Sequence, residues 1–221
     1  MESDKQQMKP LHRTWLYTFI VWGLYFIVSK VLFFVKIEGR ENIPKDRNCG
    51  LMGNPQCILD PLMLALCVPD SEIHFMGKKE LWNNKLLGWA FTKVHGFPVD
   101  RGNMDMGAIR TAMNVLKEGD TLGIFPEGTR SRTGHMLPLL GGASMLALRS
   151  RCDVIPVYID GNYRPFRRMT VRVGKPVEMD DLLALRVTKE SCDTLTGRIE
   201  AEFAQLSHGK SLPAPAEQTQ T

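Results

Sequence analysis

Short apolar runs that alternate with stretches of helical periodicity constrain the fold of this chain most. Apolar runs of strand length, bounded by turn residues, are typical of buried strands. Five such runs are present: residues 49–54, 72–77, 121–126, 153–160 and 169–174. Alternation of strands and helices predicts an α/β domain with a mixed, largely parallel sheet flanked by helices.

Two helices are predicted with most detail. The first has apolar residues at helical spacing, with Asn103 or Asp105 as its N-cap and Gly119 as its stop. The apolar face of this first helix consists of Met106, Ile109, Ala112, Met113 and Leu116. The second is the last helix, in which Leu195, Ile199 and Phe203 repeat at every fourth position.

An apolar segment at residues 15–35 contains one charge, Lys30, and as a helix it would extend roughly 30 Å. That length suits a retained membrane anchor, because a cleaved signal peptide is shorter and ends in small residues. Lysines and arginines on both sides leave its orientation open, and Lys30 favours entry into one leaflet. We therefore expect an anchor at 1–36, one domain at 37–207 and a disordered tail at 208–221, with the protein on the cytoplasmic face of a membrane.

The net charge leaves several classes of binding partner open, whereas the cysteines disfavour a metal site. The net charge of +4 suits nucleic acid, an anionic membrane or a phosphorylated substrate, and equally a slightly basic surface. The five cysteines form no CxxC pair and have no histidine at zinc-ligand spacing, so we expect no metal site and a reducing compartment. Two roles are open for a set of basic residues: contact with lipid headgroups, or simple exposure to solvent. These residues are Lys78, Lys79, Arg164, Arg167 and Arg168.

The segment LGIFPEGTRSRTG, residues 122–134, is the strongest functional signal. An apolar strand ends at Phe125, a proline turn follows, and a carboxylate, a glycine and a cation then come together at the end where open α/β sheets bind ligands. The segment is not a phosphate-binding P-loop, because Thr129 stands where that loop needs lysine and Glu127 would face the phosphates.

A second cluster, GFPVDRG, covers residues 96–102. An arginine in a turn flanked by glycines before a helix can bind a phosphate with two hydrogen bonds. A structural ion pair between Asp100 and Arg101 is the alternative, and the sequence leaves both open.

The order GNPQCILDPL, FMGKKELW, FPVDRGN, IFPEGTRSRTG and VIPVYIDG over residues 35–177 resembles the membrane-bound glycerolipid acyltransferases. The most similar members are the 1-acylglycerol-3-phosphate O-acyltransferases. The resemblance implies transfer of an acyl chain from acyl-CoA or acyl carrier protein to lysophosphatidate, which gives phosphatidate, without a metal or other cofactor. It implies membrane lipid as a partner and no nucleic acid.

In that family, a histidine directly after an asparagine is the general base, and an aspartate separated from the histidine by four residues orients it. Here Asn54 and Asp60 match, but Pro55 occupies the histidine position. The glycerophosphate-binding residues of the family fall on Arg101, Glu127, Gly128, Thr129 and Arg130, and the apolar-proline motif falls on residues 154–157. Many members carry a lysine where this chain has Leu140.

Proline neither donates nor accepts a proton, and a positioned general base contributes about 10²- to 10⁴-fold to rate. We therefore expect impaired or absent acyl transfer, with a non-catalytic protein that binds lysophospholipid or acyl-CoA as the alternative. His95 is a candidate substitute base because Asp100 follows it at similar spacing, whereas Cys57 is more typical of a small buried side chain. An esterase is disfavoured, since no G-x-S-x-G motif occurs.

Overall fold

A seven-stranded sheet forms the centre of the molecule. The computed structural model describes residues 23, 26–27, 32–45, 48–69, 71–100, 105–130, 136–161 and 163–208. Within these residues the strand order is β1-β7-β6-β2-β5-β3-β4, and all neighbouring strands are parallel except β6 and β7. The strands are β1 (Val35–Glu38), β2 (Cys49–Gly53), β3 (Ile73–Lys78), β4 (Gly96–Val99), β5 (Thr121–Ile124), β6 (Asp153–Asp160) and β7 (Met169–Val173).

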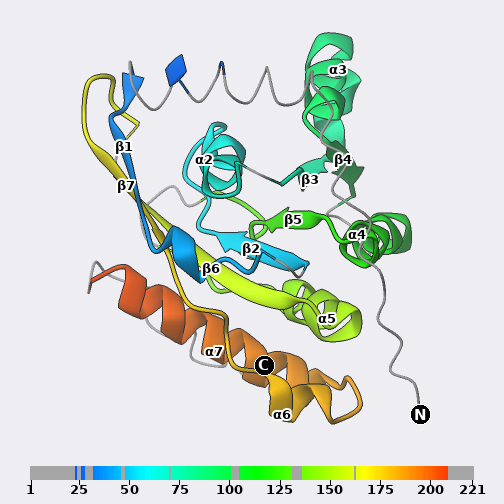
Figure 1. Ribbon diagram of the computed structural model, residues 1–221. Coiled ribbons are helices and arrows are strands. Elements are labelled where there is room, and N and C mark those ends of the chain that lie inside the picture. The colour runs from blue at the N-terminus through cyan, green and yellow to red at the C-terminus, as the bar shows by residue number, and fades with distance from the viewer. Residues whose placement is uncertain are drawn as a thin grey trace, which may run out of the picture.

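Helices cover both faces of this sheet. Figure 1 shows α2 on one side and α5 and α7 on the other. The helices are η2 (Arg40–Asn42), α2 (Asp60–Cys67), η3 (Lys79–Asn83), α3 (Lys85–Lys93), α4 (Met106–Glu118), α5 (Gly141–Ser150), α6 (Asp180–Leu183) and α7 (Lys189–Leu206). The predicted α/β architecture with a mixed, largely parallel sheet is confirmed.

Two apolar cores lie on the two faces, and strand residues alternate between them. Leu51 and Ile155 belong to the core that includes α2, whereas Met52 and Val154 belong to the core that includes α4, α5 and α7. This alternation follows from the two-residue period of strand side chains. It explains why the central strands carry apolar residues on both of their faces.

The predicted caps of two helices can be compared with the structure. The Asp105 carboxylate accepts a hydrogen bond from Ala108 N–H at 2.9 Å, and Gly119 ends α4 with φ 94°. Asp105 is therefore the N-cap, while the other candidate, Asn103, lies outside the described residues. A capping box between Thr188 and Ser191 starts α7.

The two edge strands were not predicted. β1 and β4 are four residues each, and β4 contains Pro98, which a sheet tolerates at an edge because no neighbour there needs its N–H. Val35 and Lys36, which the expected anchor includes, pair with β7 in β1. Most of the expected anchor and residues 209–221 of the expected tail lie outside the described residues. In the part of the chain that the structure describes, no helix has the length and apolarity needed to cross a bilayer.

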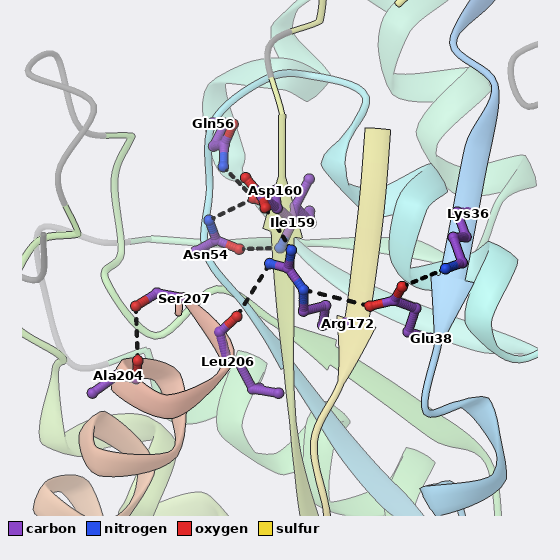
Figure 2. A network of polar contacts seen from close by, with 10 residues as sticks. All are labelled: Lys36, Glu38, Asn54, Gln56, Ile159, Asp160, Arg172, Ala204, Leu206 and Ser207. Carbon is purple, nitrogen blue, oxygen red and sulfur yellow. Dashed lines mark hydrogen bonds and ion pairs between the residues drawn. The ribbon is translucent and has the colours of Figure 1, made fainter. Parts of the chain in front are cut away.

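Arg172 of β7 links this strand to β6, to β1 and to the last helix (Figure 2). Its guanidinium lies 2.8 Å from Asp160 at the end of β6 and 3.5 Å from Glu38 of β1. It also donates to the Leu206 carbonyl at 3.2 Å, at the C-terminal end of α7. A cation is favoured there by the helix dipole. This contact fixes the last helix against β7.

Candidate active site

The carboxyl ends of three neighbouring strands, β6, β2 and β5, bring the candidate site together. The Asn54 side chain follows β2, Glu127 follows β5, and Tyr163 follows β6. In a parallel sheet these ends share one edge, which is where open α/β folds bind ligands. Motif residues from two distant segments of the sequence, Asn54 and Glu127, therefore lie at the same edge of the sheet.

Asn54 extends the pairing of β2 with β6 beyond the last strand residue. Its side-chain oxygen accepts from Ile159 N–H at 2.7 Å, and its side-chain nitrogen donates to the Ile159 carbonyl at 3.2 Å. Gln56 donates to the same carbonyl at 2.5 Å (Figure 2). Asn54 is buried, so both of its polar ends need such partners. Its contacts hold the loop between β2 and α2 against β6.

Asp60 is the buried acid of the site and the first residue of α2. Pro61, the next residue, suits a first helical turn because its missing N–H would have no partner there. One carboxylate oxygen of Asp60 accepts from the N–H groups of Gln56 and Cys57, the latter at 2.6 Å. The other oxygen accepts from the Tyr163 hydroxyl at 2.5 Å. Both carboxylate oxygens are thus engaged within the protein.

Burial is the main influence on the acidity of this group. It raises the pKa of Asp60, although the hydrogen bonds from Tyr163, Cys57 and Gln56 and the charge of Arg130 act in the opposite direction. Burial also raises the pKa of the Tyr163 hydroxyl, as does the neighbouring Asp60 charge. Tyr163 therefore stays protonated and donates to Asp60, and it cannot accept a proton.

Pro55, at the position of the expected base, is buried. It contributes no proton donor or acceptor beyond its carbonyl oxygen. Tyr163 makes a side-chain hydrogen bond to Asp60, the residue that the family resemblance pairs with a histidine. The sequence analysis missed Tyr163, since it lies 103 residues from Asp60 and belongs to none of the motifs.

Glu127 is the second buried carboxyl of the site. It accepts from Leu137 N–H at 2.8 Å and is 5% exposed. Burial raises its pKa to about 7; the Leu137 hydrogen bond opposes this shift, and the Asp60 charge adds to it. Glu127 therefore fixes the segment that leads to α5, and it shares an electrostatic environment with Asp60.

The residues after Glu127 form the exposed rim of the site. Gly128 has φ 69°, in the left-handed region that favours glycine. Thr129 and Arg130 are exposed. Arg130 is close enough to lower the pKa of Asp60. Arg101, the other predicted phosphate-binding cation, lies outside the described residues.

The structure excludes His95 as a substitute base. It directly precedes β4, at the amino ends of the parallel strands, whereas Asp60 lies beyond the carboxyl end of β2. The sheet thus separates the two side chains. Cys57 is half-buried near Asp60 but contributes its backbone N–H to that carboxylate. All five cysteines are free thiols, and burial raises the pKa of Cys49 and Cys67 to about 12.

Comparisons with known proteins identify the family. A family model described as Acyltransferase matches residues 34–160, which span the sheet from just before β1 to the end of β6. The chain belongs to the acyltransferase family. The matched range includes Asn54, Asp60 and Glu127.

Two bacterial relatives of this acyltransferase are similar over most of its length. The 1-acyl-sn-glycerol-3-phosphate acyltransferase of Bacillus subtilis is 32% identical over 79% of this chain and 88% of its own. The protein of the same name from Streptococcus pneumoniae is 31% identical over 79% of this chain and 69% of its own. A crystal structure of the 1-acyl-sn-glycerophosphate (LPA) acyltransferase from Thermotoga maritima covers 90% of this chain and 80% of its own with a TM-score of 0.63. At 24% identity that likeness supports the fold.

Proposed function

We propose that this acyltransferase-family chain binds lysophosphatidate and an acyl donor at the carboxyl edge of β6, β2 and β5, and that its acyl transfer is severely impaired. The donor is acyl-CoA or acyl carrier protein, and no further cofactor enters the reaction. The similarity to 1-acyl-sn-glycerol-3-phosphate acyltransferases along most of the chain supports this acceptor class.

The engagement of Asp60 carries the proposal of impairment. As the acceptor hydroxyl attacks the thioester carbonyl, its proton must pass to a base, and the donor thiolate leaves. Pro55 cannot take the proton, and Tyr163 holds its own proton on Asp60 at 2.5 Å. Without a positioned base, the rate should fall by about 10²- to 10⁴-fold.

The same contacts favour a second function, a non-catalytic protein that holds lysophosphatidate at a membrane. Arg101 and Arg130 would bind the phosphate, and the turn of Glu127, Gly128 and Thr129 leads directly to Arg130. Asn54 would hold the neighbouring loop against β6. Binding of lysophosphatidate at an affinity typical of the active relatives, without turnover, would single out this function.

A bilayer surface is the partner that suits α3. Leu86 and Trp89 are 73% and 60% exposed, and Lys93 follows at helical spacing on the same face. The opposite face packs against η3, since a side chain at Gly88 would approach the backbone of Trp82 to 3.1 Å. Exposed leucine and tryptophan flanked by lysines suit an anionic lipid surface. We place this face on the cytoplasmic leaflet.

Acyl transfer to lysophosphatidate in detergent micelles tests the proposal. The unsubstituted chain, Pro55→His and a double variant Pro55→His/Asp60→Asn are compared with each donor. We expect turnover from Pro55→His alone, because only that variant combines an imidazole with the carboxylate that orients it. Turnover by the unsubstituted chain equal to that of Pro55→His would overturn the role assigned to Pro55.

A further inference from the structure

Four side chains with metal-binding atoms meet at the opposite edge of the sheet from the acyltransferase site. Glu72 directly precedes β3, His74 lies within β3, His95 directly precedes β4, and Asp120 directly precedes β5. These strands are neighbours in the order β5-β3-β4, so their amino ends lie side by side. None of these residues takes part in the function proposed above.

The cluster is compact. Ligand atoms of Glu72, His74 and His95 all lie within 4.8 Å of one another. His95 Nε2 is 3.5 Å from a Glu72 carboxylate oxygen, and the two imidazole rings meet edge to face with centroids 4.9 Å apart. His74 Nε2 is 3.2 Å from Asp120 Oδ2. Tetrahedral zinc with bonds of about 2.0–2.1 Å needs donors roughly 3.4 Å apart, which small side-chain rotations reach.

Strand hydrogen bonds hold the backbone of the cluster. The Glu72 carbonyl accepts from Thr121 N–H at 3.3 Å, and the His95 carbonyl accepts from Phe75 N–H at 3.2 Å. His95 has φ 60°, a left-handed conformation that is uncommon outside glycine. That conformation turns the chain just before β4. The donors are therefore positioned by the sheet and not by a mobile loop.

We propose that Glu72, His74 and His95 bind a divalent transition metal ion of the zinc class, with Asp120 orienting the His74 ring. Two imidazoles and one carboxylate are a common set for such ions, with the fourth position left to water. A carboxylate hydrogen-bonded to a metal-bound histidine commonly fixes its orientation. The bound ion joins the starts of β3 and β4, and Asp120 at the start of β5 contacts it only through His74.

The electrostatics of the cluster agree with metal binding. Burial lowers the pKa of His95, and a charge on His74 lowers it further. The charges of Glu72 and Asp120 act in the opposite direction. Metal ions bind the neutral form of an imidazole. Glu72 is 6% exposed, while the His74 and His95 side chains are 20% and 23% exposed, which leaves the ion a route in.

The expectation of no metal site came from cysteine and histidine spacing along the sequence. His74 and His95 are 21 positions apart and Asp120 lies farther on. Only the pairing of β3 with β4 and β5 brings them together. The inference thus departs from that expectation and rests on the sheet.

Two measurements on the full chain, first treated with a chelator, test the proposal. Calorimetry measures zinc binding, and thermal melting with and without Zn²⁺ measures its effect on stability. We expect one equivalent to bind and the melting temperature to rise, since an ion that binds the folded state stabilises it. Affinity should fall at least about tenfold in His74→Gln and in His95→Asn. Asparagine tolerates the left-handed conformation at position 95, so that variant removes the ligand with little strain.

The matched control is His208→Asn, which removes an exposed histidine that also has positive φ, 51°. It should bind zinc as the unsubstituted chain does. Absence of zinc binding, or equal affinity in His74→Gln, would overturn the proposal. So would a thiolate charge-transfer band on Co²⁺ substitution, which would put the ion on cysteine. If His95→Asn fails to fold by circular dichroism, His74→Gln decides alone.

Discussion

The Asp60 carboxylate has hydrogen-bond partners on both oxygens, and the histidine that we propose it would orient is replaced by Pro55. The N–H groups of Gln56 and Cys57 hold one oxygen, and Tyr163 takes the other. The loop therefore keeps its shape with Pro55 in place. Restoring activity therefore requires a base at position 55, and Tyr163 competes with that base for a carboxylate oxygen of Asp60.

Adding Tyr163→Phe to Pro55→His should raise the rate of acyl transfer about tenfold above Pro55→His alone. A hydrogen bond to a charged group contributes about 1.5–3 kcal/mol, and the introduced imidazole must otherwise displace the Tyr163 hydroxyl from Asp60. Initial rates with lysophosphatidate measure the difference. Tyr163→Phe alone is the control and should show no turnover. Equal rates for the single and double variants would show that Tyr163 does not compete.

Glu127 should make the protein less stable as pH rises. Its pKa is about 7 in the folded chain against 4.5 when solvated, so between these values the folded state holds a proton that the unfolded state has lost. The free energy of unfolding then falls from about pH 4.5 to about pH 7 and levels off above. Glu127→Gln should flatten most of this decline in urea unfolding. A residual slope is expected from Asp60, whose pKa burial also raises.

The exposed Glu118→Gln variant serves as the control for that series and should keep the full decline. A Glu127→Gln profile that parallels the unsubstituted one would mean that the Glu127 carboxyl titrates alike in both states.

Among the elements, the central strands were predictable and the edges were not. β2, β5 and β6 are buried on both faces, so their apolar runs stand out in the sequence. β1 is short and alternates with Lys36 and Glu38, and β4 contains Pro98, so neither has the usual signature of a strand. Pairing with β7 and β3 makes them strands. That tertiary contact is absent from any local pattern.

Close packing between β5 and β3 depends on Gly123. A side chain there would approach Phe75 Cε1 to 2.3 Å. Because Phe75 is buried, Gly123→Ala should reduce the free energy of unfolding by about 1–3 kcal/mol. Urea unfolding measures this. Gly197→Ala in α7 is the matched control, with nothing within 4 Å, and should stabilise by roughly 0.5–1 kcal/mol. Equal effects of the two substitutions would contradict the packing argument.

The exposed face of α3 should insert Trp89 into lipid. Brominated phosphatidylcholine vesicles containing anionic phosphatidylglycerol quench tryptophans that reach the acyl chains. Trp89→Phe should remove part of the quenched fluorescence. Trp82→Phe, the control, should remove none, because Trp82 packs against Phe91 and donates to Thr92 at 3.1 Å. Unchanged quenching in Trp89→Phe would place α3 away from the bilayer.

Across the whole molecule, the sheet presents one set of polar groups at each end of its strands. Asn54, Asp60 and Glu127 could be predicted, since each stands in a motif at the end of a strand. Tyr163 and the pairing of His74 with His95 could not, because strand order brings them into place. A single sequence shows which residues end a strand, but not which strands are neighbours.

Because the two sites lie at opposite ends of the strands, they should bind their ligands independently. Asp120 and Glu127 flank β5, and its four residues alone extend roughly 13 Å, beyond the 7–10 Å within which side chains usually couple. Saturating Zn²⁺ should therefore leave the affinity for lysophosphatidate unchanged. Because coupling between two binding sites is reciprocal, saturating lysophosphatidate should also leave the affinity for zinc unchanged. Calorimetric titrations in both orders measure this. A matching shift in the two affinities would instead show that ion binding at the amino ends moves the β5 strand and the Glu127 turn beyond it.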